Sequence, residues 1–253
     1  RAPSGSTAAE ARLPLRPGAL DAALQIESPL PWSPEDPALY TLELAIEDPP
    51  GDPALRCTRR FGFRALERDG TTLLLNGRPV HLRGALHWGW YPETLTPTPD
   101  AETVRAEFAK LRAMGFNLVK LCLFVPSQTY FDVADEEGML LWQEFPLWLP
   151  DVTPDLRRRA PDEYRAIMAL VQPHPSVALV SLGCELGRKV DAAFVQSLDE
   201  AVRGSAQGML LCDNSGSGEA YGAQTADASD FYDYHFYCDL HYFDPLIDHF
   251  HRD

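Results

Sequence analysis

A single stretch decides the fold of this chain: Val177-Ala178-Leu179-Val180-Ser181-Leu182-Gly183-Cys184-Glu185. An apolar run of this length, rich in β-branched residues, predicts a buried strand that ends abruptly at Gly183. In a barrel of parallel strands, the reactive groups lie at the C-terminal ends of the strands. The stretch therefore predicts a barrel strand that carries a catalytic carboxylate, Glu185.

From residue 73 onward, the sequence alternates between strand and helix patterns. The expected strands are 117–124, 139–145, 209–213 and 231–237, and the expected helices are 101–114, 128–137, 162–171 and 191–202. The first helix should begin after the N-cap Asp100 and carry Val104, Phe108, Leu111 and Met114 on one face. Repeated β/α units with apolar strands predict a parallel sheet covered by helices. Counted from residue 80, about six strands can be found. The expected fold class is α/β, and a (β/α)8 TIM barrel would be incomplete, since it needs eight strands.

The first 66 residues have a different pattern. Residues 39–46 alternate between apolar and polar, which predicts a strand with one buried face, and residues 56–63 should form the returning strand after the turn Pro49-Pro50-Gly51-Asp52. These strands predict part of a β-sandwich. Further on, Asn76-Gly77 between two apolar runs predicts a tight hairpin at the start of the second part.

Charge and cysteine usage narrow the class of protein. The formal net charge of −15 argues against a nucleic-acid partner and against anionic membrane surfaces. No run of about 18 apolar residues is present, so no transmembrane span is expected, and Arg1 is not followed by a leader pattern. The five cysteines form no C-x-x-C pair, which favours reduced, buried thiols and a cytoplasmic location.

Five segments in a fixed order resemble glycoside hydrolase family 2, the family of β-galactosidases, β-glucuronidases and β-mannosidases. The resemblance covers roughly residues 25–240. Its segments are Trp32-Ser33-Pro34-Glu35-Asp36-Pro37-Ala38-Leu39-Tyr40, Arg60-Phe61-Gly62-Phe63-Arg64, residues 75–84 (LNGRPVHLRG), residues 131–145 (FDVADEEGMLLWQEF) and residues 174–185 (HPSVALVSLGCE).

The resemblance implies a fold and an activity. The expected domains are a partial immunoglobulin-like β-sandwich over residues 1–66 and a TIM-barrel catalytic domain over residues 67–253. The expected activity is that of an exo-acting retaining β-glycosidase, which uses two carboxyl groups, acts on a carbohydrate substrate and needs no cofactor. Glu185 would be the general acid and base, with a pKa raised by burial and by an anionic partner. The nucleophile, a Glu on the seventh strand of the family, would lie beyond Asp253. A homo-oligomer is compatible with the resemblance.

The sequence departs from the family pattern at two places. Cys184 stands where the family has an Asn that contacts the sugar hydroxyl next to the reacting carbon, and a thiol is a poor hydrogen-bond donor. Residues 121–126 also lack the Ser-His-Tyr of many galactosidases and glucuronidases. Because of these two departures, the identity of the sugar substrate cannot be read from the resemblance.

Further residues are candidates for the sugar pocket, each with a structural alternative. For the loop residues His87 and Trp88 the alternative is loop packing, and for Glu144 it is a structural ion pair. The substrate-binding candidates are His87, Trp88, Glu144, Trp148, Cys184, Asp213, His235 and Tyr237, with Asn214 beside Asp213. His235 and Tyr237 alternate along one strand and so share a face, with core packing as the alternative.

Other chemistries are weaker interpretations of the sequence. The cluster His235, His241, His249 and His251 has no zinc-motif spacing, so no metal is expected there. The glycine-rich loop at 214–219 lacks the pattern of a phosphate-binding loop, and no basic partner is readable near Cys184 to make it a nucleophile. A non-catalytic carbohydrate-binding or assembly protein on the same barrel is the second hypothesis.

Overall fold

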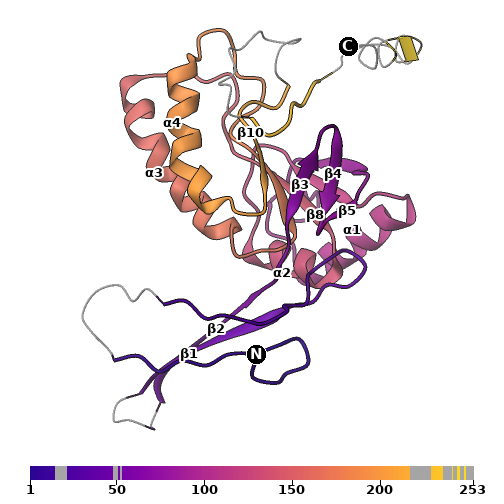
Figure 1. Cartoon of the computed structure of the whole chain (residues 1–253). Helices are drawn as coiled ribbons and strands as arrows, with labels where there is room; N and C mark the ends of the chain where they lie inside the picture. The colour runs from indigo at the N-terminus through magenta and orange to yellow at the C-terminus, as the bar shows by residue number, and fades with distance from the viewer. Residues whose placement is uncertain are drawn as a thin grey trace.

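The computed structural model describes residues 1–14, 22–47, 51, 53–216, 229–235, 241, 244, 245 and 248. A parallel sheet with helices packed on it forms the larger part, and a long two-stranded ribbon extends away from it (Figure 1). No helix among these residues is both long enough and apolar enough to cross a membrane.

The parallel sheet has five strands in the described part of the chain: β6 (Gly84–His87), β7 (Leu118–Leu121), β8 (Leu140–Glu144), β9 (Val177–Ser181) and β10 (Leu210–Cys212). Their order in the sheet, β10-β9-β8-β7-β6, follows the chain order, and every pair is parallel. Beyond β10, an isolated parallel bridge joins Ser215 to Asp233 at the place of the expected sixth strand. This is the wall of an incomplete (β/α)8 barrel, so the predicted fold class is confirmed.

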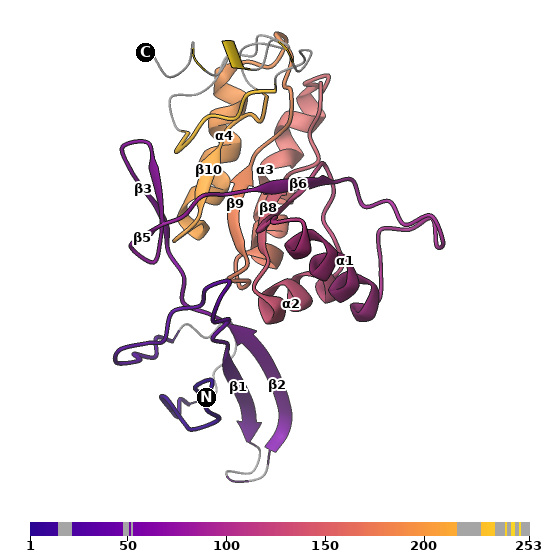
Figure 2. The ribbon, with the colours of Figure 1, turned by 90° about the vertical axis from the view of Figure 1, so that its right-hand side faces the viewer.

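The helices between these strands are α1 (Ala101–Ala113), α2 (Gln128–Glu137), α3 (Pro154–Val171) and α4 (Ala192–Val202), with a short 3-10 turn, η1 (Arg203–Ser205). Asp100 caps α1 as predicted, since its side chain accepts from the Thr103 amide at 2.8 Å. Gly138 ends α2 in the left-handed conformation, with φ +70°. Figure 2 shows the helices from a second side.

Two helix predictions were wrong in part. The third helix begins at Pro154, not at 162, because Thr153 accepts from the Leu156 amide and Pro154 fits the first turn; Pro161 lies inside the helix without ending it. On α1, Val104 and Phe108 are buried, but Met114 is 65% exposed because it follows the last helical residue.

Alternate residues of the strands face two different environments. One face contributes Val119, Leu121, Leu141 and Leu211 to a core shared with the helices. The other, concave face carries Leu118, Leu140, Leu179 and Leu210 near the N-terminal ends of the strands, where they pack with Trp32, Leu66 and Leu75. This end of the concave face is therefore closed by apolar side chains.

A small antiparallel sheet helps to close that end. It consists of β3 (Leu66–Asp69), β4 (Thr72–Leu75) and β5 (Arg78–Pro79). The predicted hairpin is confirmed, because Asn76 and Gly77 both have positive φ, 51° and 75°, as a two-residue turn of this hand requires. Arg64 holds two neighbouring segments in place by donating to the backbone carbonyls of Pro175, Val177 and Gly208.

The ribbon consists of β1 (Tyr40–Glu47) and β2 (Pro53–Phe61), paired antiparallel. Both strands were predicted, but the buried face was not found: Leu42 and Leu44 are 46% and 52% exposed. A ribbon of two strands has no second layer to cover either face among the described residues. At its base, Tyr40 contacts Phe61 and Phe63.

Candidate active site

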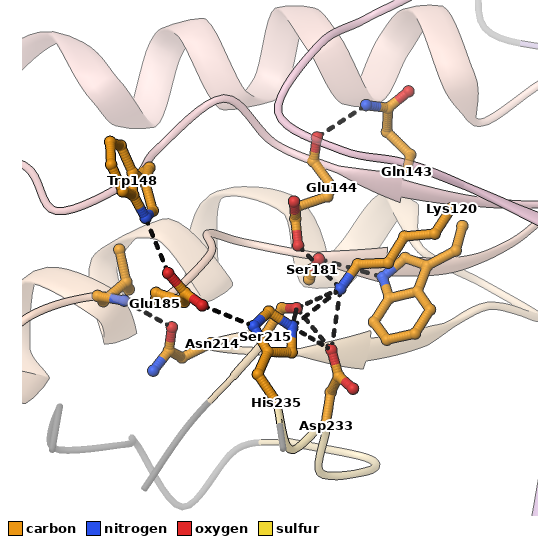
Figure 3. Close-up of polar contacts among 12 residues, drawn as sticks. Lys120, Gln143, Glu144, Trp148, Ser181, Glu185, Asn214, Ser215, Asp233 and His235 are labelled. Atoms are coloured by element: carbon orange, nitrogen blue, oxygen red, sulfur yellow. Dashed lines mark hydrogen bonds and ion pairs between the residues drawn. The ribbon is translucent and has the colours of Figure 1, made fainter. Parts of the chain in front are cut away.

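Polar side chains gather at the C-terminal end of the concave face, opposite the apolar closure. Lys120 comes from β7, Glu144 ends β8, and Glu185 follows β9, while Ser215 and Asp233 form the bridge beyond β10. Figure 3 shows these side chains pointing toward one another. Because the C-terminal ends of parallel strands meet at one edge, residues far apart in the sequence form one cluster.

Glu185 is the central carboxylate of this cluster and is 5% exposed. The indole Nε1 of Trp148 donates to Glu185 Oε2 at 3.0 Å, and His235 Nδ1 lies 2.9 Å from Oε1 (Figure 3). The backbone of Glu185 has φ +48°, a conformation that costs a residue with a side chain about 1–2 kcal/mol. Its amide donates to the Ser215 carbonyl at 2.7 Å, so the neighbouring strand end holds the conformation.

A chain of charged groups continues from His235. Its Nε2 lies 3.3 Å from Asp233 Oδ2 and 3.1 Å from Ser215 Oγ. Lys120 Nζ donates to Asp233 Oδ2 at 2.9 Å and to Ser215 Oγ, and it lies 4.2 Å from the centre of the Trp142 ring. Lys120 thus contacts Asp233 and Ser215, which in turn contact His235, the partner of Glu185.

Glu144 is fully buried beside this lysine. Its Oε1 lies 3.1 Å from Lys120 Nζ, an ionic contact whose alignment falls short of a hydrogen bond. Its Oε2 has no hydrogen-bond partner among the described residues. A buried carboxylate with an open oxygen is uncommon and marks a place where a ligand can bind.

The charges of the cluster shift several pKa values. The hydrogen bond to Asp233 raises the pKa of His235 to about 9, against the effect of partial burial, and the bond to Glu185 adds to it. Burial disfavours ionisation of Asp233, but His235 and Lys120 outweigh it and hold its pKa well below the usual value. Burial also opposes the charge of Lys120, yet Glu144 and Asp233 raise its pKa. At neutral pH both bases are therefore cationic.

Two thiols lie against Glu144. Ligand atoms of Cys122, Glu144 and Cys184 lie within 4.8 Å of one another, and all three residues are buried. The hydrogen bond to Cys184, burial and the nearby Glu144 together raise the pKa of Cys122. Cys184 is also within the same distance of Glu185 and His235.

Several of the predicted site residues lie in this one cluster: Glu144, Trp148, Cys184, Glu185 and His235. Asp213 is buried beside it, where its Oδ1 accepts from Ser229 Oγ at 2.6 Å. Asn214 Oδ1 accepts from the Leu186 amide at 2.9 Å and so holds the turn after Glu185. Tyr237 lies outside the described residues.

His87 belongs to a neighbouring group of contacts. His87 Nε2 lies 3.3 Å from Glu107 Oε1, and the Gly89 amide donates to its Nδ1 at 2.8 Å. Glu107 also accepts from the hydroxyl groups of Tyr91 and Tyr130. These contacts agree with the loop-packing alternative for His87, while Trp88 is 53% exposed.

Three residues of the cluster were not predicted from the sequence: Lys120, Ser215 and Asp233. For Lys120 a signal was present, because it is the only charged residue within the apolar run 118–125. A cation inside a buried strand needs anionic partners, and this need marks a functional cluster. Ser215 and Asp233 carry no comparable signal.

Comparisons with known proteins agree on one family. A family model described as glycosyl hydrolases family 2 matches residues 3–64. A β-galactosidase of Enterobacter cloacae is 27% identical over 176 residues, covering 66% of this chain and 17% of the relative. A putative β-glucuronidase of Formosa agariphila is 30% identical over 188 residues, 70% of this chain and 18% of the relative.

Solved structures show the same fold. A β-glucuronidase of Bacteroides uniformis superposes with a TM-score of 0.76 and 21% identity, covering 91% of this chain and 30% of that one. A β-glucuronidase of Parabacteroides merdae gives a TM-score of 0.65 at 24% identity, over 75% of this chain and 25% of that one. The chain thus spans less than a third of the length of each of these proteins.

Proposed function

The chain belongs to glycosyl hydrolase family 2, and we propose that it carries the acid/base part of the active site of a retaining, exo-acting β-glycosidase. The observation that supports this most is the placement of Glu185. It is a buried carboxylate at the C-terminal end of a barrel strand, held in a strained backbone conformation and contacted by an indole and an imidazole.

In the proposed reaction, Glu185 first acts as an acid. The bond between the anomeric carbon and the leaving oxygen breaks, the proton of Glu185 goes to that oxygen, and a second carboxylate forms an ester with the sugar. Glu185, now ionised, takes a proton from water as the water oxygen attacks the anomeric carbon. The carboxylate leaves, and the sugar keeps its β configuration.

The surrounding residues have supporting roles in this proposal. Trp148 and His235 orient the carboxyl group of Glu185 from its two oxygens. Glu144, Cys184 and the exposed face of Trp148 line the place of the sugar, a β-linked galactoside or glucuronide by analogy with the names of the relatives. Lys120 balances the negative charge of Glu144 and Asp233.

The second carboxylate of the pair is proposed to come from a part of the family fold outside these residues. Inside the cluster, Glu144 and Asp233 are both paired with Lys120, which makes them poor nucleophiles. The domain division at residue 66 is part of the same proposal, since the family model matches 3–64. The free thiols of the described cysteines support a cytoplasmic location.

One observation favours the alternative of a non-catalytic carbohydrate-binding protein. An acid catalyst must hold a proton, but the cationic His235 lies 2.9 Å from Glu185 and favours its ionised form. In the enzyme, the anionic second carboxylate must offset this influence. In a binding protein, no such compensation is needed.

The replacement Glu185→Gln in the full-length protein separates the two candidates. For the enzyme, turnover of aryl β-glycosides should fall by about 10²–10⁴-fold, since general acid/base catalysis contributes that much. The control is Glu163→Gln on the exposed face of α3, which should leave turnover unchanged. Absence of hydrolysis in the parent protein, with sugar binding retained, would support the binding protein and overturn the enzyme.

A further inference from the structure

Two cysteines and a glutamate from three neighbouring strands meet at one point of the concave face. Cys122 follows β7, Glu144 ends β8 and Cys184 follows β9. Their exposed fractions are 4%, 0% and 5%, and one ligand atom of each lies within 4.8 Å of the other two. The spacing along the chain hides this group, because its members are more than 20 residues apart.

We propose that Cys122, Glu144 and Cys184 form a binding site for a thiophilic divalent cation of the zinc type. Two thiolates and a carboxylate are three protein ligands, and they leave a fourth position for water or another ligand. Sulfur ligands select zinc and similar soft ions over magnesium and calcium, which prefer oxygen.

The distances suit this assignment. Two thiolates on one tetrahedral zinc lie about 3.8 Å apart, given zinc–sulfur bonds of about 2.3 Å. The ligand atoms here are at most 4.8 Å apart, so the two sulfur atoms must approach by about 1 Å or less and each sulfur–oxygen pair by about 1.3 Å or less. Rotation of the side chains can supply this movement.

Charge balance also supports the site. Three anionic ligands carry three negative charges, which a divalent ion and the buried Lys120 together neutralise. Lys120 already lies 3.1 Å from Glu144 Oε1, while Glu144 Oε2 has no hydrogen-bond partner among the described residues. An ion can therefore bind the open oxygen without breaking the contact with the lysine.

A second group around the same cysteine is a weaker site. Cys184, Glu185 and His235 are equally close together, but Glu185 and His235 already bind each other at 2.9 Å. The other nitrogen of His235 faces Asp233 and Ser215. A metal ion there would have to replace the contact that holds Glu185, so we assign the ion to the group that contains Cys122.

Titration of the reduced full-length protein with Co²⁺, followed by competition with Zn²⁺, tests the site. We expect one equivalent of Co²⁺ to give a thiolate-to-cobalt charge-transfer band with the visible bands of a tetrahedral ion, and Zn²⁺ to abolish both. Cys122→Ser and Cys184→Ser should each weaken the band, because only one thiolate remains, and weaken zinc binding about 100-fold or more, since even outer contacts of a metal ligand contribute 10–100-fold.

Two control variants make the result specific. Cys212→Ser removes another buried thiol from the concave face, and Cys57→Ser removes an exposed one; both should bind Co²⁺ like the parent. Absence of the band in the parent, or a band of unchanged intensity in Cys122→Ser, would overturn the proposal. His235→Asn should keep the band, and its loss there would move the ion to the other group. These readouts are independent of hydrolysis, so they can fail while the glycosidase proposal stands.

Discussion

The two ends of the concave face are made by the same strands but contain opposite kinds of side chains. At the N-terminal end, Leu118, Leu140 and Leu179 pack against Trp32 in a closed apolar layer. At the C-terminal end stand Lys120, two residues after Leu118, and Glu144, four residues after Leu140, with Asp233 beside the lysine. Because alternate residues of a strand face the same side, a shift of two or four positions exchanges one environment for the other.

This difference separates stability from chemistry. Burying apolar side chains stabilises the fold, whereas burying charges costs free energy that only good pairing can offset. The C-terminal end also contains a residue with positive φ, Glu185, which adds strain. The apolar end therefore stabilises the barrel, whereas the charges and the strained backbone of the polar end are explained by a role in binding or catalysis.

The largest expected effect comes from breaking the charge balance of the polar end. Lys120→Met leaves Glu144 and Asp233 buried without their cation. We expect the free energy of unfolding to fall by about 3–5 kcal/mol, as for a buried ion pair that loses one partner. Urea denaturation measures this, with Lys110→Met on the exposed side of α1 as the control. A loss below about 1 kcal/mol would show that the pairing is not needed for folding.

At the apolar end, the expected effect is on stability alone. Leu140 is fully buried, and Leu140→Ala should lower the free energy of unfolding by about 3 kcal/mol through the lost contacts and the cavity left behind. Turnover per folded molecule should stay unchanged, and Leu170→Ala, at a position 55% exposed, should have little effect on either quantity. A large fall in turnover of the folded fraction would contradict the separation between the two ends.

The smallest of these effects is a dependence on pH that belongs to the polar end. The hydrogen bonds to Asp233 and Glu185 raise the pKa of His235 to about 9, although partial burial opposes this shift. A raised pKa gives stability that is fully present below the ordinary value of about 6.5 and is lost as the pH rises through 9. Because the imidazole is partly exposed and screened by solvent, we expect a loss of about 1–2 kcal/mol.

Denaturation between pH 6.5 and 9.5 compares the parent with His235→Gln. The variant should be less stable at the lower pH and should lose less stability as the pH rises. His81→Gln, at an exposed position, serves as the control. Parallel curves for the parent and His235→Gln would show that this imidazole is not held by its neighbours.

The parts of the fold that depend on local signals could be predicted from the sequence. Asp100 begins α1 and Gly138 ends α2 as expected, and the turn at Asn76-Gly77 has the required backbone conformation. Where packing decides, prediction failed: α3 continues through Pro161, and the alternating residues of β1 remain exposed without a second layer. Neither outcome is encoded within a few residues of the position.

The candidate site divides in the same way. Glu185 and Glu144 stand at strand ends that the apolar pattern and the family resemblance could identify. The partner of Lys120 could not be found, because Asp233 lies 113 residues away and only the strand order brings the two together. The pairing of the two thiols could not be predicted for the same reason, since β8, β9 and two helices lie between Cys122 and Cys184 in the sequence.

The product that Glu185→Ala forms in the presence of azide shows directly whether Glu185 is the acid/base of a retaining glycosidase. Azide needs no general base, so it can attack the glycosyl-enzyme ester where water cannot. With an aryl β-glycoside that has a good leaving group, azide should accelerate turnover of the variant, but not of the parent, and should yield a glycosyl azide of β configuration. No acceleration, or an α-glycosyl azide, would contradict the assignment of Glu185 as the acid/base of a retaining enzyme.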